Sequence, residues 1–322
     1  MKVLQSHTAG DPMRSDVKWT NLSRRQISRR LKAMGTPAGK NVVSRLLREQ
    51  GYRRRKPQKK RTMKQHADRN AQFEKIAKLK QQYLKMGKPV LSIDTKKKEL
   101  LGNFYREGIT DAVSATVVND HDFSSYGNGY VIPHGIYDIG RNEAALHLNS
   151  SHDTSEFACH SIALWWCEQG QVNYPDTNEL LILCDGGGSN SSLFYLFKED
   201  LQALSNRLGL AIRIAHYPPY CSKYNPIEHR LFPHVTRACK GVPMENIETA
   251  KYYMEKTETT KGLNVFVRII DKVFETGRQY AKDFKENMTI KFDDILPKWN
   301  YRTVPLLKSI VRTVFSNLLR YQ

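Results

Sequence analysis

The sequence contains little cysteine and no long apolar run. Its five cysteines form an odd set without a close pair: Cys159, Cys167, Cys184, Cys221 and Cys239. Such a set indicates neither a disulfide framework nor a thiolate zinc site, so we expect reduced and mostly buried thiols. No segment approaches the roughly 18 to 20 apolar residues that span a bilayer, and the N-terminus lacks the apolar stretch of a secretory signal. The sequence therefore predicts a soluble, intracellular protein without a membrane partner.

Acidic residues are scarce in the first part of the chain. Residues 1–89 contain 25 Lys and Arg but only 5 Asp and Glu, whereas residues 90–322 contain 26 and 27. A basic head of this kind favours a polyanionic partner, either nucleic acid or an anionic membrane surface. The head has few aromatic residues and narrow apolar faces, which disfavours insertion into lipid. Nucleic acid is therefore the expected partner.

Residues 1–52 are predicted to form a helix-turn-helix segment. Ser23 and Gln26 form a capping-box start, and Ile27, Leu31 and Met34 then share one helical face. The second helix is expected to bury Val42, Val43, Leu46 and Leu47. It would expose Lys40, Asn41, Ser44, Arg45 and Arg48 to a DNA major groove. The alternative is a plain helical hairpin with a solvated basic face.

A basic arm and a connecting helix are expected over residues 53–88. The run from Arg53 to Arg61 contains a proline and almost no apolar side chains, which predicts an extended segment. Counterion release would let this arm follow DNA phosphates without sequence preference. The side chains expected to do so are Arg53, Arg54, Arg55, Lys59 and Lys60. A helical pattern returns between Lys64 and Met86.

The body, residues 89–300, has the pattern of an α/β domain. Strands are predicted at 90–94, 101–106, 129–139, 144–149, 180–184 and 210–216, and helices at 154–168 and 193–208. A meander of strands followed by alternating strands and helices predicts a mixed sheet with flanking helices.

Three acidic residues stand where the predicted local structure changes. Asp94 follows the apolar run VLSI and Asp185 follows LLILC, so both leave buried strands. Asn225 as N-cap and Pro226 as first helical residue place Glu228 at the start of a helix. Each residue alone is more simply a turn former or a helix cap. Together they can converge as oxygen ligands for Mg²⁺ or Mn²⁺, and their mutual repulsion would require a cation.

Five strings carry a resemblance to a known family: SIDTKKKELLGNF (92–104), HDTSEFA (152–158), WWCEQG (165–170), LILCDGGGSNSS (181–192) and HYPPYCSKYNPIEHRLF (216–232). They resemble the DDE transposases of bacterial insertion sequences, specifically the Rhodopirellula-type group, over about residues 19–299. The resemblance implies a ribonuclease-H-like catalytic domain and two divalent ions. It also implies cutting and joining of double-stranded DNA at transposon ends and target, by a homo-oligomer assembled on DNA. A nucleoid-associated, cytoplasmic location would follow.

The resemblance also assigns roles to individual residues. Asp94, Asp185 and Glu228 fall on the catalytic, metal-binding positions of the family. Asp153 matches a recurrent family position, and we expect it to orient substrate or ligands, together with Asn225 and His229. Lys96 and Lys97 could meet DNA phosphates, although a solvated basic turn is the alternative.

Some features depart from the family pattern. The string GDPMRSDVKWTN (10–21) resembles the interior of a longer family member, so we expect an N-terminal truncation. Residues 301–322 are expected to add a helical tail. Two alternative functions stay open: a catalytically silent DNA-binding transposase remnant, and a ribonuclease-H-like nuclease that cuts without joining.

Overall fold

The computed structural model describes residues 8–11, 14–55, 66–188 and 192–306, with side chains from residue 20 onward. The described residues fall into two compact units, one within residues 1–61 and the other within residues 62–322. No helix in the described ranges is long and apolar enough to cross a bilayer. All five cysteines are free and four of them are buried, as expected.

The smaller unit combines a hairpin with two short helices. The hairpin of β1 (Thr8–Asp11) and β2 (Arg14–Thr20) had no signal in the sequence pattern. Helix α2 (Arg24–Ala33) begins with the predicted capping box: the Ser23 hydroxyl accepts the Gln26 N–H, and the Gln26 side chain accepts the Ser23 N–H. Helix α3 (Lys40–Glu49) follows after a turn.

The core of this unit is small. Ile27 and Val43 are buried against each other's helices, and Leu47 packs beside them. Val42 and Leu46 are 39% and 43% exposed, so the expectation that they point inward is wrong. A helix that packs against one short neighbour buries only the stripe that faces it, and positions one residue away along the chain lie to the side of that stripe.

The larger unit is built on a mixed sheet, nine-stranded in the described part of the chain, in the order β10-β11-β8-β7-β3-β5-β6-β9, with β4 paired to β5. Its strands are β3 (Val90–Thr95), β4 (Glu99–Leu100), β5 (Tyr130–Asp138), β6 (Glu143–Asn149), β7 (Glu179–Cys184), β8 (Ala211–His216), β9 (Asn264–Ile269), β10 (Lys291–Phe292) and β11 (Asn300–Thr303). Strands β3, β5 and β6 form an antiparallel meander, whereas β3, β7 and β8 run parallel. This central arrangement is the predicted ribonuclease-H-like topology.

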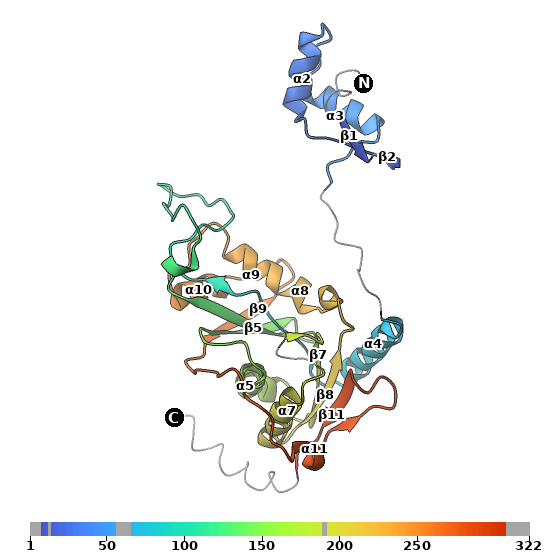
Figure 1. Cartoon of the computed structure of the whole chain (residues 1–322), viewed down its shortest axis with the longest axis vertical. Coiled ribbons are helices and arrows are strands. Elements are labelled where there is room, and N and C mark those ends of the chain that lie inside the picture. The colour runs from blue at the N-terminus through green and yellow to red at the C-terminus, as the bar shows by residue number, and fades with distance from the viewer. Residues whose placement is uncertain (1–7, 12–13, 56–65, 189–191, 307–322) are drawn as a thin grey trace. The chain divides into compact units, whose positions relative to one another are not determined.

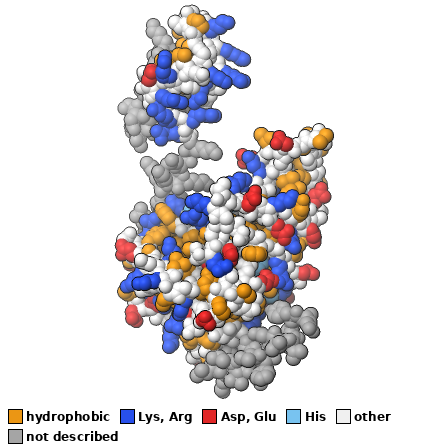
Figure 2. Space-filling model, turned by 180° about the vertical axis from the view of Figure 1, so that it is seen from behind, with side chains coloured by type: hydrophobic (Ala, Val, Ile, Leu, Met, Phe, Trp, Pro, Cys, Tyr) orange, Lys and Arg blue, Asp and Glu red, His pale blue; other side chains and the backbone are white. Residues whose placement is uncertain are grey.

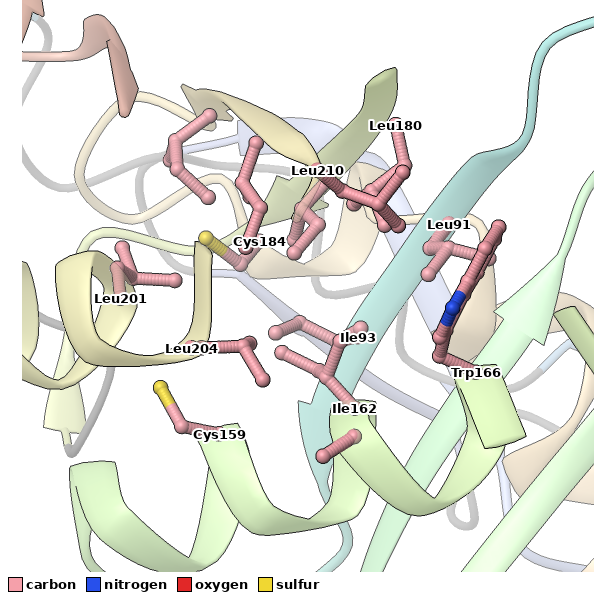
Figure 3. Packing of buried hydrophobic residues seen from close by; sticks show 14 of the residues in the cluster. Leu91, Ile93, Cys159, Ile162, Trp166, Leu180, Cys184, Leu201, Leu204 and Leu210 are labelled. Atoms are coloured by element: carbon pink, nitrogen blue, oxygen red, sulfur yellow. The ribbon is translucent and has the colours of Figure 1, made fainter. Parts of the chain in front are cut away.

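Helices cover both faces of the sheet (Figure 1). One face carries α5 (Ser155–Trp165) and α7 (Tyr195–Leu208); the other carries α4 (Arg69–Lys85), α8 (Ile227–Arg230), α9 (Phe232–Ala238) and α10 (Ile247–Glu255). Because side chains alternate along a strand, Leu91 and Ile93 pack toward α5 and α7 while Val90 packs toward α4. Figure 3 shows Ile162 of α5 and Leu204 of α7 reaching this apolar layer.

The predicted strand at 101–106 is wrong. Pairing between β4 and β5 ends at Leu100. Gly102 then takes a φ of +136°, which favours glycine, and its N–H bonds to the carbonyl of Met244 at 2.7 Å. The chain therefore leaves the sheet there. Thr154, by contrast, caps α5 as predicted, and α5 continues into a π-helical turn (Trp166–Gly170).

The larger unit extends past both expected boundaries of the catalytic domain. Helix α4 had been expected to connect the head to the body. It packs Ile76 and Tyr83 on the sheet, and Gln72 exchanges hydrogen bonds of 3.0 and 2.7 Å with Asn300. Strand β11 continues the sheet to Thr303, into the stretch expected as a tail. Residues 307–322, where most of the helical tail was expected, lie outside the described residues.

Candidate active site

Two of the three candidate carboxylates leave neighbouring parallel strands at the same edge of the sheet. Strands β3 and β7 pair in parallel, with Ser92 opposite Leu183. Asp94 stands two residues after Ser92, and Asp185 stands two residues after Leu183 and directly follows β7. Equal offsets from a paired position bring the two side chains to one level of the sheet. This placement follows from topology and from the apolar runs that precede each aspartate.

The third carboxylate is brought in by a buried amide. Asn225 is completely buried; its side-chain oxygen accepts the Ser92 hydroxyl, and its amide donates to the Ile93 carbonyl at 3.0 Å. The Ser92 hydroxyl in turn accepts the N–H of Ile227 at 2.9 Å. These bonds fasten the start of α8 to β3, next to Asp94. The Asn225 side chain was expected to cap this helix, but the structure uses it as a bridge between the two elements.

Charges of neighbouring carboxyl groups contribute to raised pKa values at this edge of the sheet. Burial, the charge of Asp185 and the charge and hydrogen bonding of Glu228 together raise the pKa of Asp94 to about 8. Burial also raises the pKa of Asp185, with contributions from Glu228 and Asp153, while the Gly187 N–H at 3.3 Å opposes the shift. Four carboxyl groups, those of Asp94, Asp153, Asp185 and Glu228, therefore share one electrostatic site.

Asp153 is tied into this site by a chain of hydrogen bonds. Its carboxylate accepts the Thr95 hydroxyl at 3.1 Å, and that hydroxyl also contacts the Nδ1 of His134 at 3.0 Å. His134 is fully buried in β5, and burial lowers its pKa to about 4, although the Asp153 charge raises it. The neutral ring is therefore hydrogen-bonded to the Thr95 hydroxyl, and this hydroxyl is hydrogen-bonded to Asp153.

The donor set fits a hard divalent ion, because every candidate ligand is a carboxylate oxygen. Burial and nearby carboxylate charge raise the pKa values of Asp94 and Asp185, and a bound cation would stabilise the charged forms of both groups. Among the residues that the structure describes, no three His, Cys, Asp or Glu side chains are already arranged to hold one ion.

Other predicted residues lie at the periphery of this site. His229 is exposed, and its ring contacts the carbonyl of Lys223 in the preceding turn. Lys96 forms an ion pair with Glu99, which Arg106 also contacts, so its charge is already partnered. Lys97 is exposed. Sequence reasoning missed Ser92, Thr95 and His134; a serine inside the apolar run VLSI was the one local signal.

The candidate DNA-contacting residues of the head are mostly accessible. Lys40, Asn41, Arg45, Arg48 and Arg53 to Arg55 are exposed, and Arg45 pairs loosely with Glu49 at 3.7 Å. Ser44 instead donates its hydroxyl to the Lys40 carbonyl of its own helix at 2.9 Å. Figure 2 shows Lys and Arg side chains spread over this unit with few acidic ones. Lys59 and Lys60 lie outside the described residues.

The sheet has the ribonuclease-H-like topology. Carboxylates lie at the ends of two of its parallel strands and at the start of a following helix. This combination is the one found in the class of DDE enzymes. The comparison of sequences is consistent with this class. The sequence model of the Rhodopirellula transposase DDE domain matches residues 1–305, and the chain belongs to that family. No curated protein matches the chain.

Solved structures of the Mos1 transposase are similar in fold. They include a paired-end complex with the left transposon end (13% identity, TM-score 0.45), a pre-cleavage transpososome (11%, 0.46) and a mariner paired-end complex with Mn (12%, 0.44). Each match covers 73% of this chain and 66% of the Mos1 chain. The chain thus spans slightly less than two thirds of the Mos1 chains.

Proposed function

We propose that the chain catalyses metal-dependent cleavage and strand transfer of DNA at the ends of an insertion sequence. The observation that supports this proposal is the position of Asp94 and Asp185 after the same paired residues of two parallel strands, with the start of α8, which carries Glu228, bonded to β3. These three residues would hold Mg²⁺ or Mn²⁺, as two ions. When bound, the ions would supply an activated water or 3′-hydroxyl and neutralise charge at the phosphate under attack.

The chain's own residues would position the reacting groups. The bridge from Asn225 to Ser92 and Ile93 keeps Glu228 on a rigid element beside Asp94. Asp153, which accepts a hydrogen bond from Thr95, would orient substrate or ligands near Asp185. Phosphoryl transfer depends strongly on such positioning, because a small misplacement of the reacting atoms lowers the rate by orders of magnitude.

Double-stranded DNA is the proposed partner. Helix α3 would offer Lys40, Asn41, Ser44, Arg45 and Arg48 to a major groove, and the arm with Arg53, Arg54, Arg55, Lys59 and Lys60 would follow phosphates. Joining DNA ends requires that both be held at once, so we expect two or more copies to assemble on DNA. Light scattering of the protein with end-containing DNA would measure that stoichiometry.

A nicking and joining assay tests the proposal. The substrate is labelled DNA carrying the ends of the element, with Mg²⁺ or Mn²⁺. Asp185→Asn removes one ligand charge at nearly constant volume, so nicked and joined products should fall at least about a hundredfold. The matched control is Asp294→Asn, which neutralises an exposed aspartate in the turn between β10 and β11. Unchanged products with Asp185→Asn would refute the assignment.

The same assay separates the alternatives. Nicked DNA without joined product would indicate a nuclease that cuts without joining. Salt-sensitive binding to DNA, with no metal-dependent product for the unaltered chain, would indicate a silent DNA-binding remnant.

A further inference from the structure

A large cavity opens beside the catalytic carboxylates. Its volume is about 730 Å³, and its wall is formed by the start of α5, the start of α7 and residues 275–285. Asp153 and Gly188 belong to this wall. Asp153 also contributes to the raised pKa of Asp185, and Gly188 follows Asp185 by three residues. The cavity therefore adjoins the proposed active site.

Aromatic rings supply much of the cavity's surface. Phe194 lies at its wall and is 59% exposed, although burial of such a ring would be favourable. Tyr195 and Tyr280 lie together, with ring centroids 5.5 Å apart and planes inclined by 42°. The amino group of Lys285 lies 4.5 Å from the Tyr195 ring and 5.5 Å from the Tyr280 ring. Flat apolar faces and a cation thus occur at one wall.

The charged side chains at this wall are of two kinds: one is held in ion pairs, and the others are exposed. Arg278 is paired with Asp200 at 2.9 Å and with Glu156 at 3.2 Å, so it holds the wall in place. Lys282 and Lys285 are exposed at the rim, together with Glu275. The two lysines can meet a phosphate, while the carboxylate of Glu275 can accept a hydrogen bond from an amino group of a base.

We propose that this cavity binds one nucleotide unstacked from the DNA strand that the carboxylates hold, with its base against Phe194 and Tyr280 and its phosphate near Lys285. The inference rests on the proposed function, because it needs a DNA strand at Asp185. A nucleotide combines a flat π surface with a negative charge, which is the combination that aromatic rings and lysines bind. Enzymes that do chemistry on a base move its nucleotide out of the stack into a pocket, where stacking and hydrogen bonds offset part of the lost pairing.

The test measures binding without catalysis. The full chain is titrated in EDTA with fluorescent element-end duplexes whose terminal nucleotides are left unpaired, so that unpairing does not obscure the result. One base at a time is removed by substituting an abasic nucleotide. Removal at one position next to the cleaved phosphate should weaken binding by unaltered protein about tenfold, as expected for loss of one stacked base. Removal at other positions should have little effect.

Variants identify the cavity as the cause. Phe194→Leu and Tyr280→Leu should each weaken binding of the intact DNA about tenfold and remove most of the sensitivity to the abasic substitution, because the rings and the base act as partners. Tyr280→Phe should behave as the unaltered chain. Tyr252→Leu is the control, since Tyr252 is an exposed ring on α10, outside the cavity.

Three results would overturn the inference: no binding of these duplexes, equal binding of base-bearing and abasic DNA at every position, or equal abasic sensitivity in the unaltered chain and the leucine variants. Failure of the proposed function would give a different experimental result from failure of this inference. Catalysis that survives Asp185→Asn would remove the assigned active site but leave the stacking measurement in EDTA valid.

Discussion

Asn225→Ala gives the sharpest test of how the site is held together. The substitution removes a fully buried amide and leaves the Ser92 hydroxyl and the Ile93 carbonyl without the partner they have in the structure. An unsatisfied buried polar group costs about 1–3 kcal/mol, so two of them should lower the free energy of unfolding by about 2–6 kcal/mol. For a unit of this size, the midpoint of thermal unfolding should fall by roughly 5–15 °C.

The same change should reduce catalysis by more than the loss of folded protein. Without the Asn225 bridge, fewer hydrogen bonds hold α8 to β3, and any shift of α8 carries Glu228 with it. A displacement of about 1 Å at the reacting groups lowers rates about a hundredfold. The assay is metal-supported nicking at a temperature where circular dichroism shows that the variant is folded.

Ser92→Ala supplies the matched comparison. It breaks the bond to Asn225 and the bond from the Ile227 N–H, so it should destabilise the same junction. The double variant should be less destabilised than the sum of the two single variants, because they disrupt one network. The reasoning fails if Asn225→Ala changes the unfolding free energy by less than about 0.5 kcal/mol, or if the folded variant nicks DNA at the unaltered rate.

Three further predictions concern other parts of the molecule. Thr95→Val keeps the shape of the side chain but removes the hydroxyl between Asp153 and His134, so the rate of nicking should fall about tenfold. Thr95→Ser keeps the hydroxyl and should nick near the unaltered rate. Equal effects of the two variants would contradict the hydrogen-bonded chain from His134 through Thr95 to Asp153. Burial lowers the pKa of His147 from its usual 6.5 to about 3, so its neutral form stabilises the fold above pH 6.5 and this contribution is lost as pH falls toward 3. At pH 5 the lost free energy of unfolding is about 2 kcal/mol. His147→Asn should therefore make the urea midpoint of unfolding less dependent on pH between 7 and 5. An unchanged pH dependence would argue against a buried neutral ring. Replacing Arg53, Arg54 and Arg55 with Ala should lower the slope of log affinity against log salt by about 0.9 for each lost phosphate contact, and an unaltered slope would show that these residues do not meet phosphates.

Much of the local structure was determined by the sequence alone. The apolar runs before Asp94 and Asp185 predicted two buried strands that end in carboxylates, because period and composition are properties of short segments. Ser23 and Thr154 likewise determined where α2 and α5 begin, since a cap involves residues only three positions apart. The uneven distribution of charge required no structure either.

The tertiary structure decided which distant residues become partners. Asn225 looked like a helix cap in sequence, yet its side chain meets Ser92 and Ile93, more than 130 positions away. His134 and Thr95 carried no local signal and became neighbours of Asp153 only because β3 and β5 pair. Periodicity reports which face of an element is apolar, but it does not report what covers that face or what lies beside it. Those contacts depend on the order of strands in the sheet, and that order places Asp94 and Asp185 at the same edge.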